Sequence, residues 1–238
     1  EDRDELLKSM SDLGVGTIVD VSATYESCEK VLALAGKYPY VYAAIGVHPD
    51  EVGELNEDKI QHMKELCRNK KVVAVGEIGL DYYWDNEPHE VQQKWFIRQL
   101  KLAGEVKKPV IIHSREAAAD TMYIMKNYAQ GLGGVIHCYS YSREMAEEYV
   151  KMGFYIGIGG VVTFKNAKKL KDVAAAIPIE KIVLETDCPY MAPEPYRGKR
   201  NQSSYIRYVA EKIAELKEMS PEEVIAVTEK NARDLYGI

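Results

Sequence analysis

The chain has 238 residues, of which 46% are hydrophobic, so it is long enough for one large α/β domain with a sizeable core. Its formal net charge of -6 excludes a global basic face for nucleic acid or membrane, so any polyanion must bind at a local patch. No apolar run reaches the roughly 20 residues that span a bilayer, no secretory signal pattern appears, and the four cysteines form no CxxC pair. We expect a single cytoplasmic domain over residues 1–238, with reduced cysteines.

Apolar residues follow strand spacing and helical spacing in turn along the chain. The first segment, from Leu6 to Leu13, has helical spacing, and the last helix is expected to open at a capping box, Ser220–Glu223. Between them, short apolar runs predict seven strands, each followed by a helical segment, at residues 17–21, 40–47, 72–75, 109–112, 135–138, 154–158 and 182–184. Strict alternation of short buried strands with helices favours a parallel sheet.

A closed barrel of parallel strands needs eight strands, one more than this pattern provides. The chain starts at Glu1 with a helical segment and without an initiator methionine. We therefore expect a TIM-type (β/α)8 barrel whose first strand precedes Glu1. Periodicity alone also permits an open doubly wound sheet, although no glycine-rich dinucleotide fingerprint follows any of the predicted strands.

The stretch from Val72 to Asp81 is the centre of the functional prediction. Four consecutive apolar residues, Val72–Val75, indicate a strand buried on both faces. Glu77 is then expected at the C-terminal end of that strand, where the loops of a parallel barrel carry its chemistry. A carboxylate at such a place costs free energy unless a positive group faces it.

Three further residues share this position with Glu77, because each follows a different predicted strand. They are His113, His137 and Asp187. A single histidine at a strand end is more often a hydrogen-bonded structural residue than a metal ligand. Four residues of ligand type at four strand ends instead favour a site for divalent metal ions. His48, which precedes Pro49 at another strand end, suits either a substrate contact or a plain turn.

Six motifs together resemble the TatD family of metal-dependent deoxyribonucleases. They are GVHP (46–49), GEIGLDYY (76–83), IIHSRE (111–116), GVIHCYS (134–140), LETDCPY (184–190) and APEPYRGKRNQ (192–202). The resemblance covers essentially the whole chain. It implies a TIM barrel of the metallo-dependent hydrolase superfamily that uses two metal ions to activate water for hydrolysis of DNA phosphodiesters, often as an exonuclease.

The resemblance also implies roles for individual residues. Glu77 would bridge two divalent ions, His113 and His137 would complete the shell of one, and Asp187 would bind the other and act as general base. Glu77 and Asp187 are thus the implied catalytic residues. The family's remaining ligands, a His-x-His pair on the first strand, are absent from this chain, which we attribute to sequence preceding Glu1. The ligand types suit magnesium, manganese or zinc.

Binding of a phosphate substrate needs further positive charge. Arg115 lies two residues beyond His113, and Arg197 and Arg200 belong to a basic loop after the last strand. Guanidinium groups can grip phosphate oxygens in pairs, so we predict that these arginines, with His48, contact DNA. The aromatic residues 82–84 suit either stacking on bases or packing.

Two other functions remain open at the level of the sequence. The same metal site could hydrolyse a small amide, lactone or phosphoester, although the basic loop favours phosphate. Alternatively, the chain could be a binding module without metal, a hypothesis that rests only on the absent His-x-His pair.

Overall fold

A computed structural model describes residues 2–84 and 86–238. They form two compact units. Among the described residues, unit 2 contains 19–84, 86–137, 148–155 and 233–238, and unit 1 contains 2–18, 138–147 and 156–232. The expected single domain stays a prediction.

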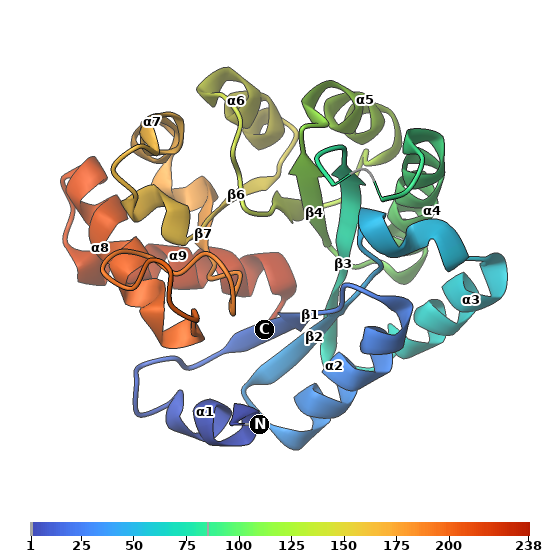
Figure 1. The fold of residues 1–238 in the computed structure, drawn as a ribbon, viewed down its shortest axis with the longest axis horizontal. Coiled ribbons are helices and arrows are strands. Elements are labelled where there is room, and N and C mark those ends of the chain that lie inside the picture. Colours follow the sequence, from blue (N-terminus) through green and yellow to red (C-terminus); the bar gives the residue numbers. More distant parts are fainter. Residues whose placement is uncertain (1, 85) are drawn as a thin grey trace. The chain divides into compact units, whose positions relative to one another are not determined.

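Helices and strands alternate along the described chain as the sequence predicts (Figure 1). The seven strands found in it are β1 (Ile18–Val21), β2 (Val41–Ile45), β3 (Val72–Asp81), β4 (Val110–Arg115), β5 (Gly134–Ile136), β6 (Tyr155–Ile158) and β7 (Ile182–Leu184). The α-helices are α1 (Arg3–Ser9), α2 (Tyr25–Lys37), α3 (Glu57–Leu66), α4 (His89–Val106), α5 (Ala118–Tyr128), α6 (Arg143–Lys151), α7 (Lys168–Ala176), α8 (Ile206–Lys217) and α9 (Pro221–Tyr236). Short 3₁₀ helices are η1 (Pro49–Glu54), η2 (Gly160–Thr163), η3 (Ile179–Lys181) and η4 (Ser203–Tyr205).

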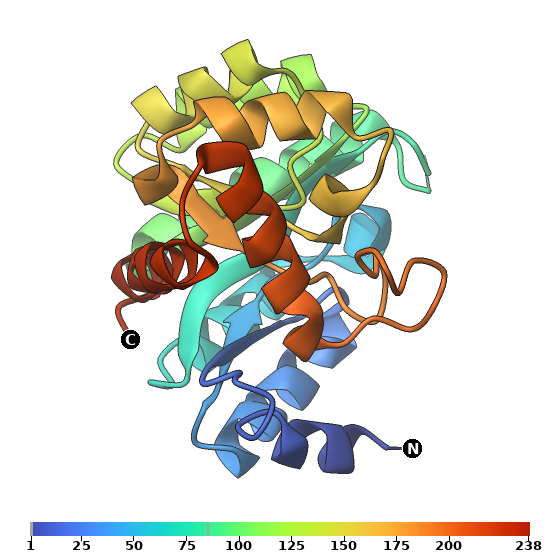
Figure 2. The ribbon, with the colours of Figure 1, turned by 90° about the vertical axis from the view of Figure 1, so that its left-hand side faces the viewer.

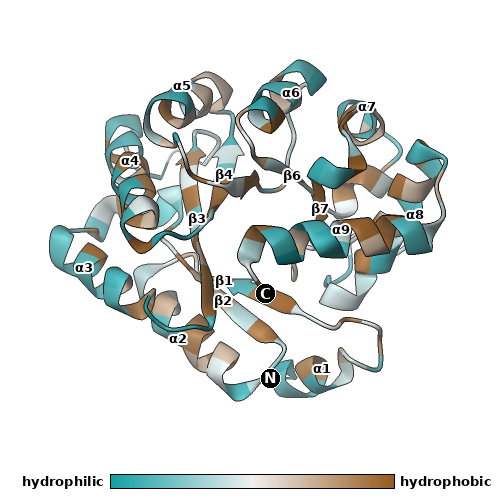
Figure 3. Ribbon diagram, turned by 180° about the vertical axis from the view of Figure 1, so that it is seen from behind, coloured by the Kyte–Doolittle hydropathy of each residue, from teal (hydrophilic) through white to brown (hydrophobic). Residues whose placement is uncertain are grey.

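In unit 2, strands β1 to β5 lie side by side in chain order. β3 pairs in parallel with β2 on one side and with β4 on the other. Helix α2 packs against β2, α4 against β3 and α5 against β4. Brown, apolar colour covers much of β3 and parts of β1 and β2, while the helices show both apolar and polar colour (Figure 3), in keeping with a parallel sheet covered by helices.

Strand β3 is longer than the sequence predicts. It continues through Glu77 to Asp81, so Glu77 lies inside the strand and not at its end. The cause is pairing with β4, in which Gly79 lies opposite His113 and Asp81 opposite Arg115. Since Gly79 has a φ of +150° and a Cβ there would overlap the carbonyl oxygen of His113, only glycine permits this close approach.

In unit 1, β6 and β7 pair in parallel, with Ile158 opposite Leu184. Helix α8 packs against β7, η2 and α7 (Figure 2). The predicted capping box before α9 is confirmed, because the Glu223 carboxylate accepts a hydrogen bond from the backbone N–H of Ser220 while the Ser220 hydroxyl accepts one from the backbone N–H of Glu223.

None of the helices in the described residues is both long enough and apolar enough to traverse a lipid bilayer.

Candidate metal centre

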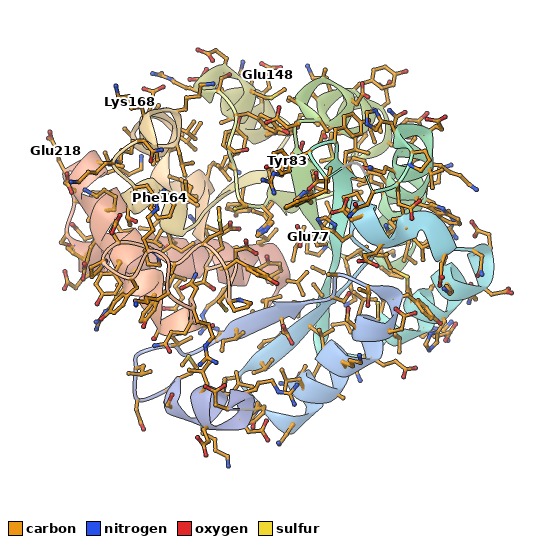
Figure 4. All side chains as sticks on the ribbon, viewed as in Figure 1. Glu77, Tyr83, Glu148, Phe164, Lys168 and Glu218 are labelled. Carbon is orange, nitrogen blue, oxygen red and sulfur yellow. The ribbon has the colours of Figure 1, made fainter. Side chains whose placement is uncertain are left out.

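The carboxylate of Glu77 lies among three imidazole rings in unit 2. Its Oε1 atom is 2.8 Å from Nδ1 of His113, 3.7 Å from Nε2 of His137 and 4.0 Å from Nε2 of His48. Burial alone would raise the pKa of Glu77, but the three imidazoles outweigh it and hold that pKa far below its usual range. Glu77, which Figure 4 labels, is therefore an anion with nitrogen atoms of three imidazole rings within 4.0 Å of its Oε1 atom.

His113 is held between two carboxylates. Its Nδ1 atom faces Glu77, and its Nε2 atom lies 2.9 Å from Oδ2 of Asp81. Burial lowers the pKa of His113, but the hydrogen bonds to Asp81 and Glu77 outweigh it and raise that pKa to about 9. The ring orientation is thus fixed from both sides, as is typical of histidines that bind metal through one nitrogen and hydrogen-bond through the other.

His48 differs from the other two histidines in its partners. Its Nδ1 atom accepts a hydrogen bond of 3.2 Å from the backbone N–H of Asp50. Burial, aided by the nearby His113, lowers the pKa of His48 to about 4, so the ring is neutral at physiological pH. With Nδ1 accepting, the remaining proton lies on Nε2, the nitrogen that faces Glu77. The ring therefore offers the site a hydrogen-bond donor.

Asp81 is a site residue that the sequence reasoning missed. It is 1% exposed and lies four residues after Glu77 on β3. Because alternate residues of a strand share a face, this spacing places Asp81 on the Glu77 side of the sheet. The four-residue spacing from Glu77 is the feature of the sequence from which Asp81 could have been predicted as a site residue. Gln92 of α4 fixes this strand end, since its amide accepts from the Asp81 N–H and donates to the Asp81 carbonyl.

Arg115 ends β4 beside the aromatic residues that follow β3. Its guanidinium carbon lies 3.8 Å from the centre of the Tyr83 ring and 5.5 Å from that of the Trp84 ring. The structure now distinguishes the two alternatives for residues 82–84, which are packing and stacking on bases. Tyr82 is half-buried and hydrogen-bonds Asp120, whereas Tyr83 and Trp84 are exposed.

The other predicted site residues lie in unit 1. Asp187 follows β7 with a φ of +51°, in a turn that the Asn201 amide holds by donating to the carbonyls of residues 186 and 190. Arg197 stacks on the Phe164 ring at 4.2 Å, and Arg200 forms a two-bond ion pair with Asp2. The roles of these residues stay predictions.

The donor set in unit 2 fits a divalent metal ion. Ligand-type atoms of His48, Asp81 and His113 lie within 4.8 Å of one another. His113 is the proposed ligand of the three, since His48 carries its proton on the nitrogen that faces the site and Asp81 orients the His113 ring. The Glu77 carboxylate and the His137 imidazole add donors of the same two classes. Imidazole together with carboxylate suits zinc and manganese, and a site richer in carboxylate suits magnesium.

Comparison with known proteins identifies the family. Residues 1–237 match the family described as TatD related DNase. The chain belongs to the TatD family. The "Uncharacterized metal-dependent hydrolase YabD" of Bacillus subtilis (strain 168) is 44% identical over 238 residues, which cover all of this chain and 93% of the relative. The "Uncharacterized metal-dependent hydrolase YcfH" of Escherichia coli (strain K12) is 38% identical over 239 residues, covering 100% of this chain and 89% of the relative.

A solved structure of the TatD family agrees with the predicted fold class. The crystal structure of YjjV, a TatD homologue from Escherichia coli K12, matches with a TM-score of 0.93 and 33% identity, covering 100% of this chain and 92% of that one. The fold is α/β and of the TIM-barrel type, as predicted. The chain is a member of a family of metal-dependent hydrolases, which confirms the coarser part of the functional prediction.

Proposed function

We propose that this TatD-family protein hydrolyses DNA phosphodiester bonds, releasing nucleotides as an exonuclease. The observation that carries the proposal is the Glu77 carboxylate with three imidazoles within 4.0 Å of one oxygen atom. Such a cluster is costly to bury and has the chemistry of a divalent-metal centre.

We propose that two divalent ions would be held by this chain: Glu77 would contribute to holding both, His113 and His137 would be ligands of one, and Asp187 would be a ligand of the other. Bound metal would supply Lewis-acid stabilisation of phosphoryl oxygens and an activated water. Glu77 needs no deprotonation before it binds a cation, because its low pKa keeps it ionised. Asp81 keeps the His113 ring turned so that Nδ1 faces Glu77.

The remaining roles concern the substrate. His48, neutral and carrying its proton on the nitrogen that faces Glu77, donates a hydrogen bond to a phosphate oxygen. Arg115, two residues beyond His113, supplies the cation that pairs with the DNA backbone. Arg197 and Arg200 are proposed to extend this contact along the strand, and Asp187 is proposed as the general base.

Nuclease assays with and without chelator test the proposal. Full-length protein should release nucleotides from DNA in magnesium or manganese, and EDTA should abolish the release. Glu77→Gln, which keeps the shape of the side chain but removes its charge, should lower the rate at least about a hundredfold, more than is typical for residues outside the metal shell. Hydrolysis of cyclic amides or small esters with none of DNA would overturn the substrate assignment.

A further inference from the structure

Two large aromatic rings are exposed side by side just beyond the candidate metal centre. Tyr83 is 55% exposed and Trp84 is 58% exposed. Their ring centres are 5.0 Å apart and the rings are nearly perpendicular, at 87°. The chain's other tryptophan, Trp95 on α4, is only 6% exposed. Exposing Trp84 leaves apolar area in water, a cost that a ligand stacked on the ring would remove.

The guanidinium of Arg115 completes this surface. It lies over the Tyr83 ring, with its central carbon 3.8 Å from the ring centre, and is 5.5 Å from the centre of the Trp84 ring. Stacking against an aromatic face orients the guanidinium plane and leaves its N–H groups at the ring's edge. Exposed π-faces beside an oriented cation are complementary to bases joined by phosphates. We call these three residues the Tyr83–Trp84–Arg115 surface.

The surface is held in place by hydrogen bonds. The Oδ1 atom of Asp81 accepts from the backbone N–H groups of Tyr83, at 2.9 Å, and Trp84, at 3.1 Å. The N–H of Tyr82 donates to the Arg115 carbonyl, and the Tyr82 ring stacks on His89. The backbone of residues 82–84, which carries the exposed rings, is therefore held by hydrogen bonds, and this lowers the entropy lost when a ligand stacks on the rings.

Asp81 also connects this surface to the metal centre. Its Oδ1 atom binds the loop, while its Oδ2 atom binds His113. Arg115 follows His113 by two residues on β4, which corresponds to about 7 Å along a strand. A nucleotide whose phosphate lies at the metal centre can therefore place its neighbour on the surface.

We propose that the Tyr83–Trp84–Arg115 surface binds unpaired bases of single-stranded DNA next to the phosphodiester that is hydrolysed. That the bound polymer is DNA rests on the proposed nuclease function. That bases stack here rests on the exposed Tyr83 and Trp84 rings beside Arg115. A base can stack on Trp84 only when its π-face is free. Inside a duplex both faces of each base are covered by neighbouring base pairs, and a blunt end leaves only one face of its terminal pair open, so the surface favours a single strand or a frayed end.

Tryptophan fluorescence tests the proposal directly, because Trp84 is exposed and Trp95 is buried. Full-length protein in EDTA is titrated with oligothymidylate of ten nucleotides, so that binding is measured without turnover. We expect Trp84 emission to be quenched by the single strand and much less by an equal concentration of blunt duplex, which has one open base-pair face at each end. In Trp84→Phe the quenching should vanish, while binding of a fluorescently labelled oligonucleotide, measured by anisotropy, should stay within about threefold because an aromatic ring remains.

Removal of the rings should weaken binding. Tyr83→Ala and Trp84→Ala should each reduce the affinity for oligothymidylate by about 5- to 150-fold, the range for loss of one stacked base. Tyr128→Ala is the matched control. Tyr128 is 43% exposed but is the last residue of α5, at the opposite end of that helix from the Arg115 end of β4. We expect this variant to bind oligothymidylate with wild-type affinity. Absence of quenching, equal quenching by duplex, or unchanged affinity of both alanine variants would overturn the proposal.

Different results would contradict the proposed nuclease function and the proposed stacking surface. Protein that hydrolyses DNA in manganese but whose Trp84 is not quenched contradicts the stacking surface alone. Protein whose Trp84 is quenched by the single strand but which releases no nucleotides supports the surface and contradicts the nuclease function.

Discussion

Asp81 and His113 share a hydrogen bond of 2.9 Å between Oδ2 and Nε2. It joins the end of β3 to β4 at the level of the candidate metal centre. The other carboxylate oxygen of Asp81 accepts from the amides of Tyr83 and Trp84. One buried side chain thus orients a proposed metal ligand and holds the loop that carries the exposed rings.

The variant Asp81→Asn tests whether Asp81 orients the His113 ring. The amide keeps an oxygen that can accept from the loop but loses the charge that fixes the His113 proton on Nε2. We expect metal affinity, measured by calorimetry, to fall about 10- to 100-fold, as for other partners of metal-bound histidine. Asp81→Glu should recover part of the loss. Wild-type affinity in Asp81→Asn would show that this carboxylate does not orient the ligand.

His48 should behave differently from His113. The variant His48→Gln removes the imidazole whose Nδ1 atom is already occupied by the Asp50 amide. Because His48 is assigned to substrate, we expect metal affinity within about threefold of wild type and a loss of at least about tenfold in kcat/KM for DNA. Loss of metal binding in this variant, with the fold intact by circular dichroism, would make His48 a ligand instead.

Metal binding should release a proton from His113. In the metal-free protein the pKa of His113 is raised to about 9, so at pH 7 the ring is protonated and must lose a proton to coordinate a cation. The apparent affinity should therefore rise about tenfold per pH unit from pH 7 and level off near pH 9. Calorimetry in two buffers of different ionisation enthalpy measures the proton directly, and identical heats in both would contradict this role.

The close approach of β3 and β4 gives a prediction about stability. Gly79 has a φ of +150°, and a Cβ there would overlap the His113 carbonyl oxygen. Gly79→Ala should lower the free energy of unfolding by at least about 2 kcal/mol, since both the conformation and the space are unsuitable. Gly36→Ala on α2, where a Cβ meets nothing within 4 Å, should instead stabilise by up to about 1 kcal/mol. Chemical denaturation compares the two variants.

Much of the fold followed from the sequence because its signals are local. The seven strands, the Ser220 cap and the order of elements depend on hydrophobic spacing and capping residues, and the structure confirms them. The length of β3 could not be predicted in this way. The two glycines and two acids that follow Val75 are typical of a loop. They belong to β3 because this segment pairs with β4, where Gly79 lies opposite His113.

Site residues could be predicted from the sequence where a side chain that can bind metal lies at the end of a predicted strand. Glu77, His113 and His137 combine both, and the structure brings them together. Asp81 was missed because its role depends on the longer strand, in which it shares a face with Glu77. The alternatives for residues 82–84 needed burial to separate them, since Tyr82 is half-buried while Tyr83 and Trp84 remain exposed.

DNA hydrolysis by full-length protein that is stripped of metal and then supplied with manganese tests the proposed nuclease centre most sharply. We expect no hydrolysis after stripping, recovery on addition of the ion, and at least about a hundredfold less activity in Glu77→Gln. Equal hydrolysis by stripped protein, reloaded protein and Glu77→Gln would contradict a metal-dependent nuclease centred on Glu77.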